Sequence, residues 1–310
     1  MKPLRIGTRG SALALWQANF VRERLEKSFG LSAELVLVKT AGDKFTQASV
    51  SQMGLKGVFI KELEDELLDG RVDLAVHSMK DVPTAIPEGL AFPAITKRED
   101  PRDCLVSREG WTLAALASGA RVGTSSLRRQ SQLRHARSDL DLRDLRGNVD
   151  TRLRKLEEGQ YDAIVLAKAG MERLGVSDKI TEVLSSDMML PAVGQGALGI
   201  EARAAENTLL DVLAKLDDAE TRAAVTAERA LLAELEGGCQ VPLGAWGRIE
   251  RGELILEACL LSVDGTDYLR RRATGLPADG EAVGRKLGKM LLDAGGDRIL
   301  RLAGRALGNG

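Results

Sequence analysis

Residues 67–76 read LLDGRVDLAV, and residues 156–166 read LEEGQYDAIVL, which repeats the same order of features. In each stretch a helical segment stops at a glycine, Gly70 or Gly159, and an aspartate, Asp73 or Asp162, precedes a short apolar run. Glycine commonly ends helices because it adopts a left-handed backbone conformation without a steric cost. A short apolar run after such a stop is typical of a buried parallel strand. The two stretches therefore predict two equivalent strands, each following a helix.

A second pair of matching stretches lies upstream of the first. Residues 5–8 read RIGT and lead to a serine at Ser11, and residues 121–124 read RVGT and lead to serines at Ser125 and Ser126. Both stretches are read as a short strand that runs into a helix. We interpret the two pairs as a duplicated α/β unit whose first copy is enlarged by a loop. Two such lobes predict a cleft, with strand ends and helix N-termini pointing into it.

The sequence changes character from about residue 217. A helix rich in Ala, Leu and Glu is predicted as far as residue 235, and alternating polarity predicts strands at 245–249, 254–260 and 268–272. Two more helices are predicted near 281–292 and 298–307. We therefore predict three domains: residues 1–97 with 194–216 as the first α/β lobe, residues 98–193 as the second, and residues 217–310 as a smaller α+β domain.

Composition narrows the class of protein. The chain has 310 residues and a formal net charge of −1. It has no apolar run of signal-peptide or membrane-helix length, so a cytoplasmic protein is expected. Its three cysteines are odd in number and show no paired spacing, which argues against a disulfide framework. With only two histidines, neither near a cysteine, no metal site is expected.

Arginines are concentrated in one part of the chain. Residues 121–155 contain nine arginines and one lysine against four aspartates, a net charge of about +6. A guanidinium group can hold a carboxylate or phosphate through two parallel hydrogen bonds, so this segment is a candidate polyanion site. Solvated helix faces are the other interpretation of the same spacing. A nucleic acid is not favoured, because the segment has no aromatic residue on which bases could stack.

Hydroxyl and basic side chains stand where predicted strands meet predicted helices. The free N–H groups of a helix's first turn, together with such side chains, form an anion site. A serine that only capped the helix would need no neighbouring arginine pair, so we favour the anion site. The groups are Thr124, Ser125, Ser126, Arg128 and Arg129 in the second lobe, Arg9 and Ser11 in the first, and Arg146 and Arg152 at a further predicted helix start.

Two other segments carry reactive groups. Residues 77–81 read HSMKD and place Ser78, Lys80 and Asp81 at the end of a strand, where open α/β sheets bind ligands. Asp81 is a candidate general acid or base, or a stabiliser of a cation, although an aspartate before a proline turn is often a turn residue. Cys239 follows two glycines that leave its thiol accessible, whereas Cys104 and Cys259 lie in apolar strands as small buried residues do.

Taken together, six stretches closely resemble the porphobilinogen deaminases, also called hydroxymethylbilane synthases. They read IGTRGSALA at 6–14, HSMKDVP at 77–83, GTSSLRR at 123–129, LRGNV at 145–149, LPAVGQG at 190–196 and EGGCQVP at 236–242. We recognise no further motif after residue 242. The resemblance implies two similar doubly wound α/β lobes of the periplasmic-binding-protein type with a cleft, plus a C-terminal α+β domain that anchors the cofactor.

The resemblance also implies an activity. The family joins four porphobilinogen molecules head to tail, with release of ammonia at each step, to give the linear tetrapyrrole hydroxymethylbilane in haem biosynthesis. Its members carry a dipyrromethane cofactor on a cysteine through a thioether, and Cys239 is the cysteine in the matching motif. Asp81 matches the catalytic carboxylate. Residues implied to bind the cofactor are Ser78, Lys80, Thr124, Ser126, Arg128, Arg129 and Arg146, and those implied to bind substrate are Arg9, Ser11, Lys56, Arg152, Arg173 and Gln195.

Chemistry refines these expectations. The aminomethyl group of the substrate is an ammonium at neutral pH, like a lysine with a pKa of about 10.4, and loss of ammonia leaves a cation. We predict that Asp81 acts mainly as an anion beside that cation. Asp150 stands where the family pattern has a small or neutral residue, and it either adds a negative charge near the carboxylate site or orients Arg146 or Arg152. A cytoplasmic monomeric transferase is expected, with no nucleic acid or membrane partner.

Two points stay open at this stage. The polar, glycine-containing segment 42–57 shows no periodicity, and a lid over an anionic ligand is one interpretation of it. The alternative function is a non-catalytic two-lobed binder of a carboxylate-rich ligand, which the arginines and the duplicated lobes alone would fit.

Overall fold

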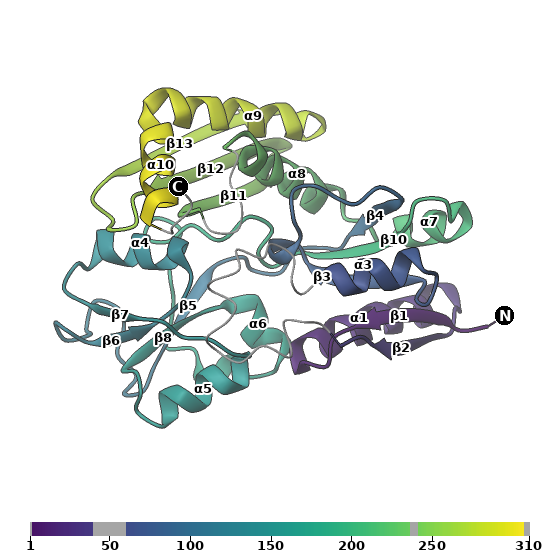
Figure 1. Cartoon of the computed structure of the whole chain (residues 1–310), viewed down its shortest axis with the longest axis horizontal. Coiled ribbons are helices and arrows are strands. Elements are labelled where there is room, and N and C mark those ends of the chain that lie inside the picture. The colour runs from purple at the N-terminus through teal and green to yellow at the C-terminus, as the bar shows by residue number, and fades with distance from the viewer. Residues whose placement is uncertain (1, 40–59, 236–240, 307–310) are drawn as a thin grey trace. The chain divides into compact units, whose positions relative to one another are not determined.

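The computed structural model of the chain describes residues 2–39, 60–235 and 241–306 (Figure 1). The chain forms two compact units, Met1–Arg98 with Ala197–Arg222 and Glu99–Gly196 with Ala223–Gly310. It therefore leaves the first unit after residue 98 and returns to it at residue 197. The division into three domains stays a prediction. Within the described ranges, every helix is too short or too polar to span a bilayer.

The first unit contains a five-stranded sheet. Its elements are β1 (Leu4–Thr8), α1 (Ala12–Phe29), β2 (Ala33–Leu37), α3 (Lys61–Leu68), β3 (Leu74–Ser78), β4 (Leu90–Ile95), β10 (Leu198–Arg203) and α7 (Asn207–Leu213). The strand order is β2-β1-β3-β10-β4. β1 is parallel to β2 and β3, whereas β10 is antiparallel to β3 and β4. Val76 packs in the cluster that contains residues of α1, and Ala75 packs with residues of α3, because successive side chains of a strand point to opposite faces.

The second unit begins with a sheet of the same design. Its elements are β5 (Asp103–Ser107), β6 (Arg121–Gly123), α4 (Leu127–Ala136), β7 (Asp141–Arg143), α5 (Val149–Glu157), β8 (Ala163–Ala167), α6 (Lys168–Arg173) and β9 (Glu182–Val183). The strand order is β7-β6-β8-β5-β9. β6 is parallel to β7 and β8, and β5 is antiparallel to β8 and β9. This order matches the first sheet strand for strand, so the predicted pair of similar α/β lobes is confirmed.

An equivalent ion pair in each lobe accounts for the matching arginine and aspartate of the two repeats. The Arg5 backbone N–H and Nε donate to Asp73 Oδ2 at 2.8 and 3.1 Å, and its Nη2 donates to Oδ1 at 2.7 Å. Arg121 makes the same three bonds to Asp162, at 2.8, 3.0 and 2.7 Å. In each lobe the bonds tie the start of one strand to the residue before its parallel neighbour. The bonds from Arg121 lower the pKa of Asp162 to about 2.

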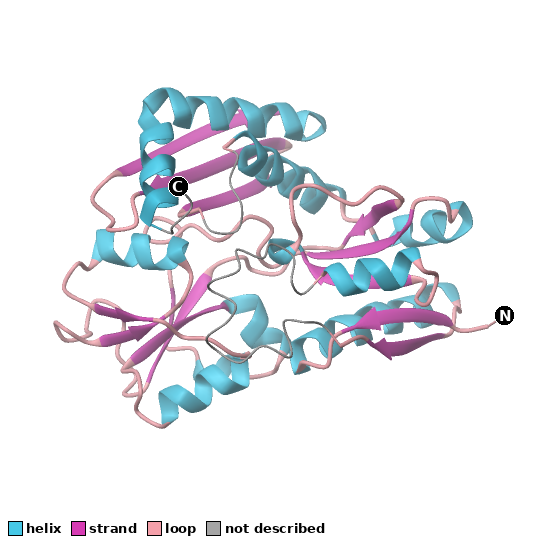
Figure 2. Ribbon diagram, viewed as in Figure 1, coloured by secondary structure: helices cyan, strands magenta, loops and turns pink. Residues whose placement is uncertain are grey.

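The C-terminal part of the second unit is α+β, as predicted (Figure 2). Its elements are α8 (Ala219–Glu234), β11 (Leu243–Glu250), β12 (Glu253–Leu261), β13 (Tyr268–Gly275), α9 (Gly280–Leu291) and α10 (Asp297–Ala306). The three strands form an antiparallel sheet, and residues of α8, α9 and the sheet share one apolar core. A Cβ on Gly284 would clash with the carbonyl oxygen of Ala227, so the close packing of α8 and α9 requires glycine at this position.

Candidate active site

A small pocket of about 90 Å³ lies in the first unit, where β1 and β3 end. Four predicted site residues line it. Arg9 and Ser11 come from the β1–α1 turn, Ser78 is the last residue of β3, and Asp81 ends the short turn that follows β3. The lining residues are Arg9, Ser11, Leu13, Ala14, Gln17, Ile60, Leu63, Val76, His77, Ser78 and Asp81. The structure thus brings Arg9, Ser11, Ser78 and Asp81 to one pocket.

The polar groups of this pocket are held by local bonds. Ser11 caps α1, and its hydroxyl accepts a hydrogen bond from the Ala14 N–H at 3.3 Å. Gln17, one turn further along α1, donates from Nε2 to the hydroxyl oxygen of Ser78 at 2.8 Å. A serine cap leaves the other first-turn N–H groups available to an anion.

Asp81 lies on a short turn that is anchored at its start. β3 ends at Ser78, and residues Met79–Asp81 form a single turn of 3-10 helix. The Met79 side chain is 2% exposed, and its N–H donates to the carbonyl oxygen of Ala197 at 3.0 Å. Lys80 is half-buried and Asp81 is exposed. The fixed turn therefore presents a carboxylate to solvent beside the pocket, which suits either a turn residue or a catalytic group.

His77, which lines this pocket, belongs to a buried pair that the sequence analysis missed. His77 Nε2 lies 2.9 Å from Glu201 Oε2, and the two side chains are 3% and 0% exposed. The partners are 124 residues apart in sequence and meet because β10 pairs with β3. The available signal was a glutamate that follows the apolar residues Leu198–Ile200 in the strand LGIEAR at 198–203.

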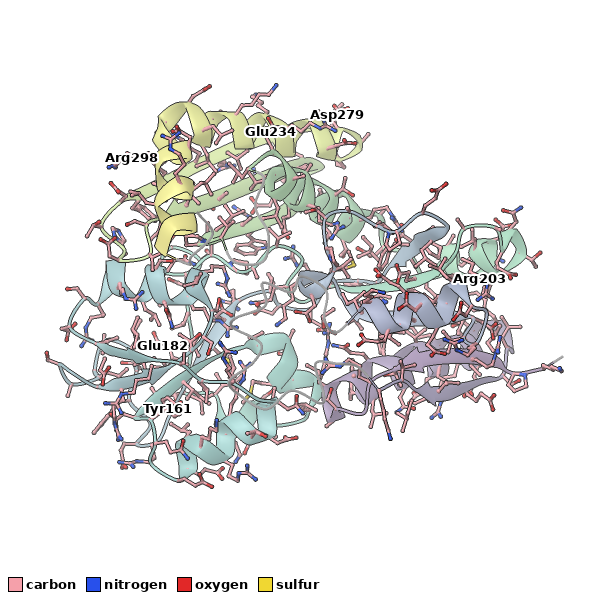
Figure 3. All side chains as sticks on the ribbon, viewed as in Figure 1. Tyr161, Glu182, Arg203, Glu234, Asp279 and Arg298 are labelled. Carbon is pink, nitrogen blue, oxygen red and sulfur yellow. The ribbon has the colours of Figure 1, made fainter. Side chains whose placement is uncertain are left out.

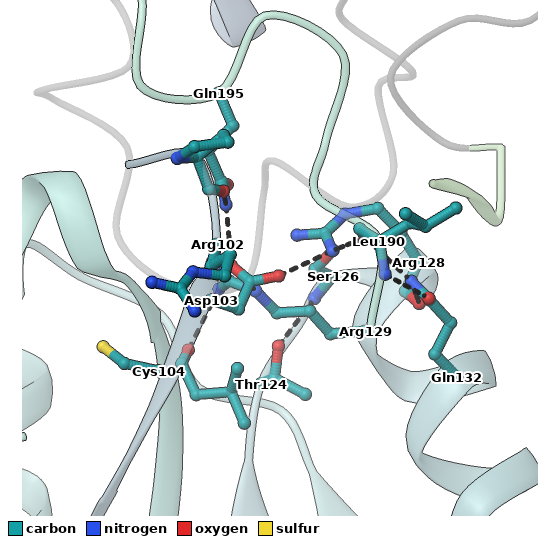
Figure 4. A network of polar contacts seen from close by, with 12 residues as sticks. Arg102, Asp103, Cys104, Thr124, Ser126, Arg128, Arg129, Gln132, Leu190 and Gln195 are labelled. Atoms are coloured by element: carbon teal, nitrogen blue, oxygen red, sulfur yellow. Dashed lines mark hydrogen bonds and ion pairs between the residues drawn. The ribbon is translucent and has the colours of Figure 1, made fainter. Parts of the chain in front are cut away.

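In the second unit a buried aspartate binds both arginines of the predicted anion site (Figure 4). Asp103, the first residue of β5, is 0% exposed. Its Oδ2 accepts a hydrogen bond from Arg128 Nη1 at 2.7 Å, and its Oδ1 accepts one from Arg129 Nη2 at 2.7 Å. Burial alone would raise the pKa of Asp103, but the two guanidinium groups hold it below its usual value. One carboxylate cannot neutralise two guanidinium groups, so this cluster keeps an excess positive charge.

Two hydroxyl side chains, those of Thr124 and Ser126, lie in the turn between β6 and α4. Thr124 is 1% exposed, and its hydroxyl oxygen accepts a hydrogen bond from the Ser126 N–H at 3.3 Å. Ser126 precedes α4, yet its side chain makes no capping hydrogen bond. The Ser126 hydroxyl is therefore not used as a helix cap. At the other end of α4, the His135 ring stacks on the Tyr268 ring with 4.4 Å between centroids.

The segment 190–196 brings Gln195 to the same cluster. Gln195 is 1% exposed, and its Nε2 donates to the carbonyl oxygen of Pro101 at 2.6 Å and to Asp103 Oδ1 at 2.9 Å. Arg173 donates to the carbonyl oxygen of Gly196 at 2.7 Å, and burial lowers the pKa of Arg173 to about 10. A Cβ on Gly196, whose φ is +88°, would lie 2.6 Å from the carbonyl oxygen of Glu99. Only glycine fits this approach.

The segment 144–152 carries Arg146 and Arg152. The hydroxyl of Tyr161 (labelled in Figure 3) donates to the carbonyl oxygen of Asp144 at 2.6 Å and holds the start of this segment. Arg152 Nε donates to the carbonyl oxygen of Gly147 at 2.7 Å. Asp150 is exposed in the first turn of α5. Its influence on the two arginines stays a prediction.

Comparison with known proteins identifies the family. The profile described as "Porphobilinogen deaminase, dipyromethane cofactor binding domain" matches residues 4–211, and "Porphobilinogen deaminase, C-terminal domain" matches residues 222–293. The chain belongs to the porphobilinogen deaminase family. The porphobilinogen deaminase of Trichlorobacter lovleyi is 52% identical over 300 residues, 96% of each chain. That of Moorella thermoacetica is 52% identical over 302 residues, 97% of this chain and 96% of the relative.

Two solved structures that the chain resembles have lower sequence identity than these relatives. An ancestral cationic amino acid solute-binding protein, AncCDT-1, gives a TM-score of 0.43 at 15% identity and covers 69% of this chain and 87% of that protein. The VFT2 domain of Bordetella pertussis BvgS gives a TM-score of 0.42 at 16% identity and covers 69% and 85%.

For a porphobilinogen deaminase, the placement of the predicted residues forms two sets. In the first unit, Arg9, Ser11, Ser78 and Asp81 line one pocket, and Lys80 stands beside Asp81. In the second unit, Asp103 binds Arg128, Arg129 and Gln195. Thr124 and Ser126 lie just before α4, and Arg173 donates to the carbonyl oxygen of Gly196. The same unit contains Arg146 and Arg152. The particular contacts of these residues with a ligand stay predictions. The sequence analysis missed Asp103.

Two predicted residues of the family site, Lys56 and Cys239, lie outside the described residues, as does the segment 42–57. The other two cysteines are free and buried. Burial raises the pKa values of the Cys104 and Cys259 thiols to about 12. Thiols with so little thiolate are poor nucleophiles, so neither suits attachment of a cofactor.

Proposed function

We propose that this chain catalyses the stepwise head-to-tail condensation of four porphobilinogen molecules to hydroxymethylbilane, with release of ammonia, on a dipyrromethane group bound to Cys239. The observation that carries the proposal is the buried excess of positive charge around Asp103, within a family whose profile is described as binding that cofactor. Each pyrrole unit of substrate and cofactor bears an acetate and a propionate. A cluster of guanidinium groups matches such carboxylates.

The residues present fit the cofactor in charge and in chemistry. Arg128 and Arg129 are 5% and 6% exposed and share the single carboxylate of Asp103, and Arg128 Nε is buried with no hydrogen-bond partner among the described residues. A buried cation without full compensation is costly, and a bound carboxylate would offset that cost. Thr124, Ser126, Arg146, Ser78 and Lys80 are the other residues that we propose to hold the cofactor. When bound, the dipyrromethane supplies the pyrrole to which successive units are joined.

Substrate would be held by Arg9 and Ser11 at the start of α1, by Arg152, Arg173 and Gln195 in the second unit, and by Lys56. The basic side chains and Ser11 offer cationic or hydrogen-bonding groups to the acetate and propionate of each incoming ring. The amide N–H₂ of Gln195 is used by Pro101 and Asp103, so Gln195 would offer its carbonyl oxygen as an acceptor. Their number suits a substrate with two carboxylates better than one with a single charge. We propose no particular pairing of arginine and ring.

Asp81 would act on the reacting substrate. The C–N bond of the substrate's aminomethyl group breaks with its electron pair on nitrogen, and ammonia leaves a cation that is shared with the pyrrole ring. A carboxylate beside the ring N–H stabilises that cation, and it later stabilises the protonated ring that forms when the new C–C bond is made. Loss of the ring proton restores aromaticity. The negative charge of Asp81 is therefore needed both before and after the new C–C bond forms, and proton transfer by Asp81 is a secondary role.

The test is release of ammonia when the purified protein is incubated with porphobilinogen. Ammonia formed with hydroxymethylbilane, and lost in Asp81→Asn, is the expected result. Binding of porphobilinogen without ammonia would instead favour a non-catalytic binder of carboxylate-rich ligands. A nucleic-acid binder would show affinity that falls steeply with salt and no dependence on Cys239.

We further propose a monomeric transferase of the cytoplasm. The free thiols of Cys104 and Cys259 suit a reducing compartment. Size-exclusion chromatography with light scattering should give a mass near the 33.3 kDa of one chain. A mass of two chains would contradict the proposed monomer but would not bear on the proposed activity.

A further inference from the structure

Asp103 occupies a position that connects three elements of the second unit. It begins β5 and pairs with Ala167, the last residue of β8. Its carboxylate accepts four hydrogen bonds: one from Arg128, two from Arg129 and one from Gln195. The donors come from α4 and from the segment 190–196. One side chain therefore fixes three of the residues that the proposed function assigns to binding the cofactor or the substrate.

Each of the two arginines also donates one hydrogen bond to a backbone oxygen. Arg129 Nη1 donates to the carbonyl oxygen of Val165 at 2.9 Å, and Arg128 Nη1 donates to that of Leu190 at 2.7 Å. Leu190 is itself held by Gln132, which accepts from its N–H at 2.8 Å. Each guanidinium group thus has a fixed direction, set by one carboxylate oxygen and one backbone oxygen.

Removing Asp103 could act in two opposite ways. Asp103 competes with a ligand carboxylate for the same guanidinium groups, so its loss would free donors and strengthen binding. It also separates and orients two like charges that are almost fully buried, so its loss would let them repel each other and move. The second effect should win, because an uncompensated charge in a buried site costs far more than one competing hydrogen bond yields.

We propose that Asp103 is a positioning residue of the carboxylate-binding site in the second unit, acting through Arg128, Arg129 and Gln195. This inference rests on the proposed function and adds to it a residue outside the motifs that resemble the family. Asp103 does not touch the ligand. It keeps the guanidinium groups in place and leaves one positive charge over for a carboxylate.

The test compares Asp103→Asn with a matched control. Asparagine has the same shape but no charge, and its amide N–H₂ would face a guanidinium donor. The control is Asp162→Asn, which breaks the Arg121–Asp162 pair at the other end of β8 in the same lobe. That pair has the same residue types and a similar arrangement of bonds, but none of its members is assigned to ligand binding.

The readouts are the fraction of protein that carries the dipyrromethane mass, and KM and kcat of the loaded fraction. In Asp103→Asn we expect lower occupancy and a KM for porphobilinogen raised on the order of 10- to 100-fold, the size of a lost charge-assisted hydrogen bond. In Asp162→Asn both should stay near wild type, even if its unfolding midpoint falls. Wild-type occupancy and KM in Asp103→Asn would overturn the inference, and tighter binding would show that Asp103 is a competitor instead.

A second variant keeps the test informative if Asp103→Asn does not fold. Gln195→Ala removes one donor to Asp103 and changes no charge, and its amide is committed to Asp103 and Pro101. We expect a partial loss of occupancy, because one of the four hydrogen bonds to the Asp103 carboxylate is removed. An unchanged occupancy in Gln195→Ala would count against the inference. A wild-type protein with no adduct and no ammonia release would mean instead that the proposed function fails.

Discussion

Replacing Glu228 by glutamine should destabilise the second unit by about 2–4 kcal/mol. Glu228 is 0% exposed and lies in α8. Its Oε2 accepts a hydrogen bond from the Gly194 N–H at 2.6 Å, and its Oε1 accepts one from the Gly247 N–H at 2.7 Å. The carboxylate therefore ties the segment that carries Gln195 to β11. Glutamine keeps a single acceptor oxygen and turns an N–H₂ donor toward the other backbone N–H.

The magnitude follows from these two bonds. A hydrogen bond to a charged group contributes about 1.5–3 kcal/mol, and a buried donor left without an acceptor costs about 1–3 kcal/mol. Partial relaxation of the segment 190–196 should recover some of this, which gives the stated range. Urea unfolding followed by circular dichroism would measure it. With a urea m-value of about 2 kcal/mol per M, the midpoint should fall by about 1–2 M.

A matched change elsewhere serves as the control. Glu250 is exposed at the end of β11 and pairs with Arg248. Glu250→Gln should change the stability by less than about 0.5 kcal/mol, as exposed ion pairs usually do. If Glu228→Gln moves the midpoint no further than Glu250→Gln does, the buried bridge is not what holds the segment, and the reasoning is refuted.

Three further predictions concern the first unit, the lobe ends and the thiols. Asp81→Asn should lower kcat on the order of 10²- to 10³-fold, while Asp81→Glu keeps part of the activity; equal rates for Asp81→Asn and wild type would exclude an anionic role. The folded-state pKa of Asp162 is about 2, below its unfolded value, so its contribution to stability is present above about pH 4 and is lost as pH falls toward 2. Asp162→Asn should flatten that part of an acid-unfolding curve, and an unchanged slope would contradict the pairing. Cys104 and Cys259 should resist iodoacetamide in the native protein at neutral pH, because burial raises their pKa values to about 12; mapping the alkylated peptides checks this.

Repetition in the sequence predicted much of the fold. The stretches 67–76 and 156–166 predicted β3 and β8. Their aspartates, Asp73 and Asp162, form ion pairs with Arg5 and Arg121 that tie each strand to its parallel neighbour. Local periodicity also predicted the strands and helices of the C-terminal part, because alternating and helical patterns depend only on near neighbours in the chain.

Long-range pairing was beyond the sequence analysis. β10 joins the first sheet about 120 residues after β3, and only that pairing brings Glu201 to His77. Asp103 stands in an ordinary apolar strand, and nothing local in PRDCLV marks it as the partner of arginines 25 and 26 residues away. Motifs predicted the side chains that would meet a ligand, whereas the groups that hold those side chains became visible only with the fold.

The measurement that tests the central claim most directly is the intact mass of the purified, denatured protein beside that of Cys239→Ser. The account predicts an excess over the sequence mass equal to two porphobilinogen units, each less ammonia, in the wild-type protein and none in the variant. A wild-type protein that has the bare sequence mass, and keeps it after incubation with porphobilinogen, would contradict the account.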